Sequence, residues 1–181
     1  MTGKIEQATL GGGCFWCTEA VFRQLKGIEL CEPGYSGGTD PNPNYDKICS
    51  GRTGHAEVVR LHFDPEVISF RKILAVFFAI HDPTTLNRQG NDVGTQYRSV
   101  IFFHTPEQRD TAMAFVEDLE KRQIFKSKVV TEISPLLNYF TAEQYHHEYF
   151  ENNPMQPYCA YVVAPKVAKA EDLFGDLFKR Q

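Results

Sequence analysis

A cysteine stands where a glycine-rich turn meets a segment with helical spacing. Residues 11–13 are three glycines, Cys14 follows them, and residues 18–25 have a helical pattern. Glycine permits backbone angles closed to other residues and lets a ligand approach the main chain. Unpaired N–H groups and the positive end of a helix dipole favour a thiolate. An ordinary thiol with a pKa near 8.5 is about 3% ionised at pH 7, and a helix end worth roughly 1 kcal/mol lowers that pKa by about 0.7. Cys14 is therefore a candidate nucleophile that needs help from a second group or from its substrate.

A carboxyl group and a long polar loop are the other candidates for chemistry. Residues 55–64 alternate as a strand does, which puts Glu57 on an apolar face with Val59, Leu61 and Phe63. Such a face removes water from a carboxyl group and raises its pKa. Residues 81–98 are polar and rich in turn formers, and loops of that length are usually functional or disordered. We expect Cys14, Glu57 and this loop to meet in space.

Three motifs in a fixed order give a specific resemblance. They are Gly-Cys-Phe-Trp at 13–16, Thr-Gly-His-Ala-Glu-Val at 53–58, and His-Asp-Pro-Thr-Thr-Leu-Asn-Arg-Gln-Gly-Asn-Asp-Val-Gly-Thr-Gln-Tyr-Arg-Ser at 81–99. The chain resembles the peptide methionine sulfoxide reductases of the A type over most of its length. The resemblance implies reduction of the S epimer of methionine sulfoxide, free or in proteins. It also implies a sulfenic acid on Cys14 and an intramolecular disulfide that thioredoxin reduces.

The resemblance assigns roles to the polar candidates. Cys14 attacks the sulfoxide sulfur, and the departing oxygen is a poor leaving group unless it is protonated. Glu57 corresponds to the acid, which requires a pKa raised from about 4.3 to above 7, or roughly 4 kcal/mol, within the range of buried carboxyls. A thiolate nearby would raise that pKa further, so the two titrations are coupled. Tyr45 and Tyr97 correspond to hydroxyl donors to the sulfoxide oxygen, and Asp92 corresponds to a supporting group.

The resemblance also implies an apolar wall for the S-methyl group of the substrate. Phe15 and Trp16 correspond to this wall, and sulfur–aromatic contacts of about 0.3 to 1.5 kcal/mol suit that use. The family pattern Tyr-His-Gln-Gln-Tyr is altered here to Tyr-His-His-Glu-Tyr at 145–149. We therefore carry over no role for His147 or Glu148.

A second thiol must capture the sulfenic acid as a disulfide. The chain has five cysteines, an odd number that suits thiols in a reducing compartment better than a fully paired framework. Cys159 lies where many family members carry the resolving thiol, after a loop rich in proline and asparagine, and is our first choice. Cys17 is one helical turn from Cys14, but it lies on the apolar stripe of the helix with Val21, which makes it a less suitable partner. Cys49 is an off-pathway alternative.

Two other functions use the same cysteines. Cys14 and Cys17 have the C-x-x-C spacing of a thioredoxin-like dithiol oxidoreductase, which would need Cys17 for activity. They could also bind a structural zinc with His146 or His147, although the sequence has no second C-x-x-C pair. A Cys17→Ser variant and metal analysis discriminate these functions from the reductase. A non-catalytic binding module would require Cys14 to be inert towards mild oxidants.

Composition limits the partners and the compartment. The chain has 181 residues, of which 42% are hydrophobic, and its net charge is −4 with Lys and Arg scattered. This gives no electrostatic footprint for nucleic acid or an anionic membrane. The N-terminus has no apolar signal region, and the longest apolar run, residues 73–80, is too short to span a bilayer. We expect one catalytic domain over residues 1–181, cytoplasmic and monomeric, without a metal or cofactor.

Periodicity and caps predict the elements that carry these groups. Strands are predicted at 5–10, 55–64, 99–103, 129–133 and 158–163, and helices at 18–25, 69–80, 105–123, 141–151 and 165–180. The last helix is amphipathic and is expected to pack on the sheet. The mixture of hairpin and crossover spacings predicts an α+β fold, a two-layer sandwich. The resemblance implies a mixed, ferredoxin-like sheet with long coil segments.

Overall fold

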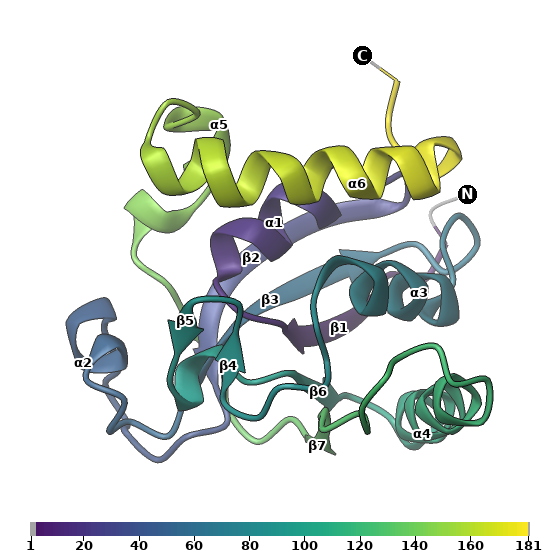
Figure 1. Ribbon diagram of the computed structural model, residues 1–181, viewed down its shortest axis with the longest axis horizontal. Coiled ribbons are helices and arrows are strands. Elements are labelled where there is room, and N and C mark those ends of the chain that lie inside the picture. The colour runs from purple at the N-terminus through teal and green to yellow at the C-terminus, as the bar shows by residue number, and fades with distance from the viewer. Residues whose placement is uncertain (1–2, 181) are drawn as a thin grey trace.

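A six-stranded mixed sheet is the centre of the structure (Figure 1). The computed structural model describes residues 3–180. The strands lie in the order β7 (Glu132–Pro135), β6 (Val100–Phe103), β1 (Glu6–Gly11), β3 (Ala56–Phe63), β2 (Ile28–Ser36) and β8 (Phe140–Thr141). Neighbours are antiparallel except β6 and β7, which are parallel. A separate hairpin joins β4 (Arg88–Gln89) to β5 (Asp92–Val93).

Helices cover the sheet and its edges. They are α1 (Phe15–Phe22), α2 (Tyr45–Cys49), α3 (Phe70–Ile80), α4 (Pro106–Lys121), α5 (Tyr149–Asn152) and α6 (Ala164–Phe174). Short 3-10 turns span Thr95–Tyr97, Gln144–His146 and Gly175–Leu177. The order β1-α1-β2-β3-α3-β6, with β6-β1-β3-β2 adjacent in the sheet, is the ferredoxin-like arrangement. The predicted α+β class with a mixed ferredoxin-like sheet is therefore confirmed.

The main core lies between the sheet and the helices. The predicted alternation of β3 is confirmed, since Val59, Leu61 and Phe63 are all fully buried. Ser69 caps α3 by accepting a hydrogen bond from the N–H of Lys72 at 3.1 Å, and the apolar residues of this helix join the same core. Burial of one face of β3 and one face of α3 thus forms the rigid framework that positions the site.

The C-terminal helix packs differently from the prediction. Its principal neighbours are α1 and α3, so it lies over these helices rather than on the sheet (Figure 1). The strand predicted at 158–163 is wrong, because Cys159–Val163 is a π-helical turn that leads directly into α6. The β-branched residues at 162 and 163 favour a strand. Burial of Cys159 and Val163, four residues apart, shows that helical spacing prevails.

The helix predicted at 141–151 is also wrong. Thr141 pairs with Gly34 as part of β8 instead of capping a helix. Glu148 has a left-handed backbone, with φ of 56°, which no regular helix tolerates. The segment therefore breaks into a 3-10 turn and the one-turn helix α5.

β2 and α2 are among the elements that the sequence patterns do not predict. β2 contains Pro33 and Gly34, both of which are depleted in strands. α2 is only five residues long and is set by its cap, since the Asn44 side chain accepts the N–H of Lys47 at 2.9 Å. The strand predicted at 129–133 lies three residues further on, as β7.

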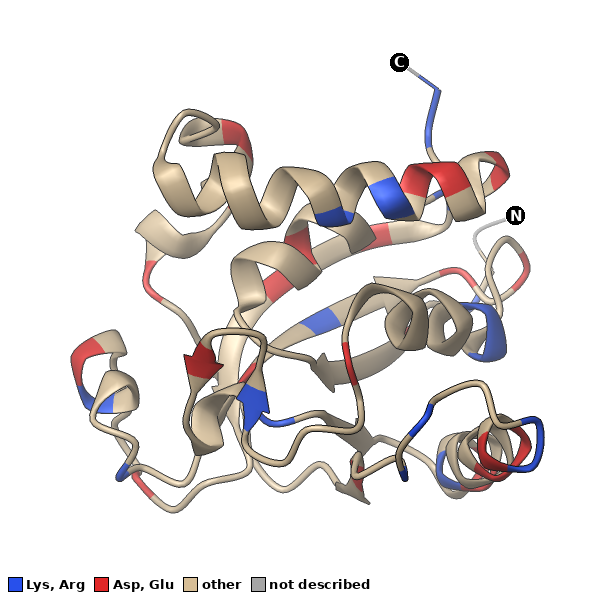
Figure 2. Ribbon diagram, in the orientation of Figure 1, with Lys and Arg blue, Asp and Glu red and all other residues tan. Residues whose placement is uncertain are grey.

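Charged residues of both signs are interspersed over the fold. Figure 2 shows both basic and acidic positions on α4 and on α6. This distribution agrees with the scattered basic residues of the sequence. Over residues 3–180, no helix is both long enough and apolar enough to cross a membrane.

Candidate active site

The glycine turn puts Cys14 at the start of α1. Gly13 has φ of +93°, and a Cβ there would lie 2.6 Å from the Gln89 side chain. Gln89 is fixed because its amide accepts the N–H of Asp82 at 3.0 Å and donates to the Asp82 carbonyl at 2.9 Å. Cys14 is the N-cap of α1, and its carbonyl accepts the N–H of Cys17 at 3.1 Å. The predicted thiol at a helix N-terminus is therefore confirmed.

The helix end does not ionise the resting thiol. Cys14 is 9% exposed. Burial is the largest cause that raises its pKa well above the ordinary value, and the charges of Glu57, Cys17 and Asp92 raise it further. A hydrogen bond from the Trp16 backbone N–H lowers it, but by less. The expected net lowering of this pKa by the helix end is thus wrong, because desolvation outweighs it, and the thiol is protonated at neutral pH.

Glu57 lies beside the same helix end. It is 1% exposed, and its Oε1 accepts the N–H of Phe15, the residue after Cys14, at 3.2 Å. Burial raises the pKa of Glu57 to about 8, with a smaller upward contribution from Asp92 and an opposing one from the Phe15 N–H. The predicted desolvation on the β3 face is confirmed. At pH 7 this carboxyl group is mostly protonated and can donate a proton.

The structure brings the other polar candidates to the same place. The charges of Glu57, Cys14 and Asp92 all raise the pKa of Tyr97, although burial is the largest cause. Burial also raises the pKa of Tyr45, with Glu57 and Tyr97 contributing. Both phenols therefore keep their protons and can donate hydrogen bonds. Asp92 reaches the cluster from β5, within the predicted polar loop.

Phe15 and Trp16 form an aromatic wall next to Cys14. Phe15 is buried, and its ring lies 5.7 Å from that of Tyr35. Trp16 stacks on Tyr149 with ring centroids 3.8 Å apart and an interplanar angle of 6°. Tyr158 meets Trp16 edge-on at 5.9 Å and donates from its hydroxyl to Asp92 at 2.6 Å. The wall is thus built from α1 together with the segment before α6.

His146, which we expected only as a possible zinc ligand, belongs to this wall. It is fully buried, and its ring lies 5.0 Å from Phe15 and 4.5 Å from Tyr45. Its Nδ1 accepts the indole N–H of Trp16 at 3.0 Å, and burial lowers its pKa to about 4. Since an indole only donates, neutral His146 carries its proton on Nε2, which is buried without a partner among residues 3–180. The Tyr-His pair at 145–146, which retains the family pattern, is the signal that could have found it.

The five cysteines differ in their surroundings. Cys17 and Cys159 share a small buried cluster with Ala20 and Val163, and the Cys159 charge acts on the pKa of Cys17. Cys49 is exposed on α2 beside Tyr45. All five are free thiols. Cys17 thus lies between Cys14, one turn away, and Cys159.

The zinc alternative receives no support from the geometry. Across residues 3–180, no group of three His, Cys, Asp or Glu side chains is arranged to hold a metal ion. The Nδ1 atom of His146, a potential ligand, is occupied by the Trp16 indole.

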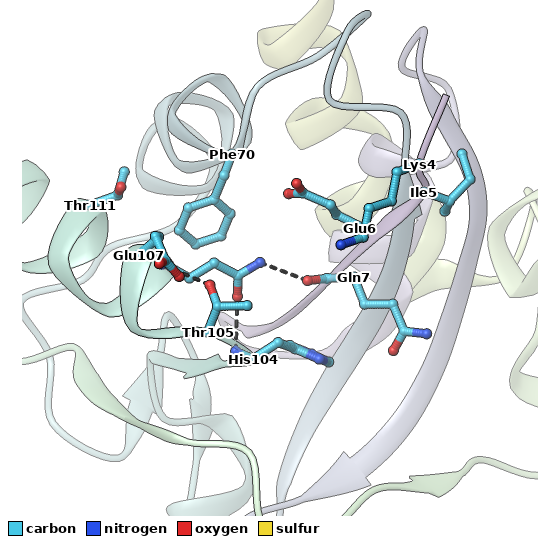
Figure 3. Close-up of a pocket in the computed structure, with 10 residues that line it drawn as sticks. Lys4, Ile5, Glu6, Gln7, Phe70, His104, Thr105, Glu107 and Thr111 are labelled. Carbon is cyan, nitrogen blue, oxygen red and sulfur yellow. Dashed lines mark hydrogen bonds between the residues drawn. The ribbon is translucent and has the colours of Figure 1, made fainter. Parts of the chain in front are cut away.

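The hollow shown in Figure 3 lies apart from these groups. It has a volume of about 510 Å³ and lies between β1, α3 and the start of α4. Its Gln108 amide donates to the Gln7 carbonyl at 2.7 Å and accepts the N–H of His104 at 2.9 Å. This side chain is therefore used to join α4 to β1, and none of the candidate site residues lines the hollow.

Comparison with known proteins defines the chain as an oxidoreductase. The sequence model described as peptide methionine sulfoxide reductase matches residues 6–176. The chain belongs to the peptide methionine sulfoxide reductase family and reduces methionine sulfoxide. It is 55% identical to peptide methionine sulfoxide reductase MsrA of Saccharolobus solfataricus over 97% of this chain and 98% of that protein. It is 54% identical to the MsrA of Deinococcus radiodurans over 94% of this chain and 83% of that protein.

Solved structures agree with this assignment. The reduced form of Mxr1 from Saccharomyces cerevisiae matches with a TM-score of 0.80 and 37% identity, over 84% of this chain and 88% of that one. Mxr1 in complex with Trx2 matches with a TM-score of 0.57 and 27% identity, over 81% and 85% of the two chains. Methionine sulfoxide reductase A of Corynebacterium diphtheriae matches with a TM-score of 0.81 and 36% identity, over 86% of this chain and 78% of that one, so the candidate site lies in a fold shared with a methionine sulfoxide reductase.

Proposed function

We propose that the chain reduces the S epimer of methionine sulfoxide, free or in proteins, with Cys14 as nucleophile. The Cys14 sulfur attacks the sulfoxide sulfur, oxygen passes to Cys14, and the products are methionine and Cys14 sulfenic acid. The thiol is oxidised and the sulfoxide is reduced, so no other electron donor takes part in this step. The observation that carries the proposal is the buried Glu57 carboxyl, hydrogen-bonded to the N–H that follows Cys14.

The proton balance supports the use of both groups. The resting site holds one proton on Cys14 and one on Glu57, because burial raises both pKa values. Glu57 donates its proton to the sulfoxide oxygen as the S–O bond breaks and then receives the proton of Cys14. The hydroxyl groups of Tyr45 and Tyr97 donate hydrogen bonds to the same oxygen, with Asp92 as the neighbouring support. The net step then needs no proton from solvent.

The aromatic wall supports methionine as the substrate. Phe15 and Trp16 directly follow the nucleophile, and their rings would form the apolar wall for the S-methyl group of the bound substrate. The Nε2–H of His146 is a buried donor, and leaving such a donor unpaired costs about 1 to 3 kcal/mol. A polar group of the bound substrate that accepts this bond would remove the cost.

The stereochemical preference is tested with separated epimers. We expect turnover of the S epimer of an N-acetylated methionine sulfoxide amide and at least about 100-fold slower turnover of the R epimer, since a misplaced oxygen loses its proton donor. Initial rates with dithiothreitol as reductant measure both. Equal rates for the two epimers would exclude the proposed arrangement of Glu57, Tyr45 and Tyr97 around one oxygen.

We propose Cys159 as the resolving thiol. Its sulfur attacks the sulfenic sulfur of Cys14, which forms the disulfide and releases water. Cys159 packs with Cys17, so a short displacement of the π-helical turn carries it towards α1. This displacement breaks the bond from the Cys159 N–H to the Gln156 side chain, 3.0 Å long. Cys17, one turn from Cys14, is the competing partner.

Disulfide mapping distinguishes the two partners. When the reduced enzyme meets one equivalent of methionine sulfoxide without reductant, we expect a Cys14–Cys159 bridge in peptide mass spectra. Cys17→Ser should still form this bridge, and it should keep turnover with thioredoxin. Cys159→Ser should lose thioredoxin-dependent turnover by at least about tenfold while it retains the first oxygen transfer. A Cys14–Cys17 bridge as the sole product would contradict the choice of Cys159.

We propose thioredoxin as the reductant of this disulfide. Support comes from the similarity to Mxr1, which has been solved in complex with Trx2. The whole chain, residues 1–181, would act as one catalytic unit and as a monomer, and the thiols supply the electrons without a cofactor.

A further inference from the structure

A buried carboxyl group on α1 lies outside the reacting groups. Glu19 is 1% exposed, on the helix that begins with Phe15 and Trp16. Burial raises its pKa to about 7, and Arg23 and a backbone hydrogen bond oppose this rise. A carboxyl group in such surroundings is costly unless its hydrogen bonds are satisfied. Its partner therefore indicates what it does.

That partner is the backbone of Glu148. Both carboxyl oxygens of Glu19 accept the Glu148 N–H, at 2.8 Å and 3.1 Å. Glu148 has φ of 56° and ψ of 33°, a left-handed conformation that is uncommon in residues other than glycine. Such a conformation persists when its surroundings hold it in place. Glu19 supplies a buried acceptor at this point of the chain.

The residues on either side of Glu148 complete the aromatic wall. His146, two positions before it, accepts the Trp16 indole N–H at 3.0 Å. Tyr149, directly after it, stacks on Trp16 at 3.8 Å. The bond to Glu19 therefore holds the segment at a point between the two contacts with Trp16.

A surface ion pair reinforces the same segment from outside. Arg23 contacts the Glu148 carboxylate at 2.8 Å and the Glu151 carboxylate at 2.8 Å. The Glu148 side chain is 56% exposed, and exposed pairs of this kind contribute little to stability. The buried bond to Glu19 is therefore the contact that fixes the turn.

We propose that Glu19 is a positioning residue for the substrate pocket, because its carboxyl group anchors the Glu148 turn and thereby holds His146 and Tyr149 against Trp16. The inference rests on the proposed function, in which Trp16 forms part of the wall for the S-methyl group. It adds a group that does not touch the substrate but sets the shape of the surface that does.

Trp16 reports on this arrangement because it is the chain's single tryptophan. In Glu19→Ala we expect its fluorescence emission to shift to longer wavelength and its quenching by acrylamide to increase. KM for a methionine sulfoxide peptide should rise about tenfold, the effect of losing one charge-assisted hydrogen bond. The rate of oxygen transfer at saturating substrate should change less than about twofold, since Cys14 and Glu57 are untouched. This split between KM and rate separates positioning from a general loss of fold.

Two matched variants complete the experiment. Glu19→Gln keeps one acceptor oxygen of the same reach and should restore both the emission and KM to within about twofold of wild type. Glu148→Gly keeps the N–H, suits the positive φ, removes only the exposed ion pair with Arg23, and should match wild type. If Glu19→Ala does not fold, Glu19→Asp keeps the charge but shortens the side chain, and should show the same red shift and raised KM.

Folded Glu19→Ala or Glu19→Asp with wild-type emission and KM would overturn the positioning role. So would a Glu19→Gln variant as impaired as Glu19→Ala, because the acceptor would then not be the relevant feature. A wild-type enzyme that reduces no methionine sulfoxide would instead refute the proposed function. In that case the emission of Trp16 still tests whether Glu19 holds the wall.

Discussion

Cys14→Ser is expected to lose methionine sulfoxide reduction by about 10⁴-fold or more in kcat/KM, on the scale seen when an enzyme loses its nucleophile. Serine oxygen cannot take up the substrate's oxygen as a stable sulfenic acid, so no disulfide follows. The hydroxyl group also lacks the nucleophilicity of sulfur. Initial rates with dithiothreitol and with thioredoxin as reductants measure the loss, and both should vanish together because the first step fails.

Cys31→Ser is the matched control for this variant. Cys31 is a partly buried free thiol on β2, and it is not among the groups assembled around Cys14. The same exchange of sulfur for oxygen there should leave turnover within about twofold of wild type, as for most substitutions away from a reacting centre. Undiminished turnover in Cys14→Ser would mean that another residue attacks the sulfoxide.

Local patterns were sufficient to predict the position of the two reacting groups. The turn at Gly13 and the helical spacing after it place Cys14 at the start of α1, because only a left-handed glycine lets the chain pass Gln89. The alternation of β3 places Glu57 on the buried face, since side chains two apart share a face of a strand. Both features depend on neighbours in sequence, which is why one sequence was enough.

The pKa of Cys14 depends on neighbours in space. The helix-end argument predicted that this pKa falls, whereas burial raises it. The helix end acts on Cys14 through its own first turn, whereas burial and Glu57 act through packing between α1 and β3. A dipole of about 0.3 to 1 kcal/mol cannot offset the desolvation of a nearly buried group. The protonated thiol in turn gives Glu57 a proton to recover after it has donated its own.

The C-terminal segment was predicted least well, for the same reason. Residues 158–163 have the composition of a strand, but Cys159 and Val163 bury against α1 and force a helical turn. His146 was missed because its importance lies in a bond to Trp16, 130 positions away along the chain. Contacts of this range follow from the tertiary fold and not from periodicity.

The acid role of Glu57 predicts a pH dependence with a definite sign. Burial raises its pKa to about 8, and the protonated carboxyl is the active form. We therefore expect kcat/KM to be level between pH 6 and about 7.5 and to fall about tenfold per pH unit above pH 8. The pKa of Glu57 in the free enzyme governs this decline, so a pH profile of kcat/KM for a methionine sulfoxide peptide measures that pKa. A rate that keeps rising through pH 9 would show that a thiolate, not the acid, limits the reaction.

Glu57→Gln tests the same group by removing its proton while preserving its shape. The amide oxygen can still accept the Phe15 N–H, so the start of α1 should remain in place. We expect kcat/KM at pH 7 to fall by about 10² to 10⁴, the usual contribution of a positioned acid, and the decline of kcat/KM above pH 8 to disappear.

Thermal unfolding supplies the control for Glu57→Gln. A raised pKa stabilises the folded state below pH 4.5 and loses that contribution as pH rises to about 8, so wild type should lose more stability than Glu57→Gln between these values. If Glu57→Gln is folded at pH 7 and as active as wild type, the proton donor is Tyr45 or Tyr97 instead of Glu57.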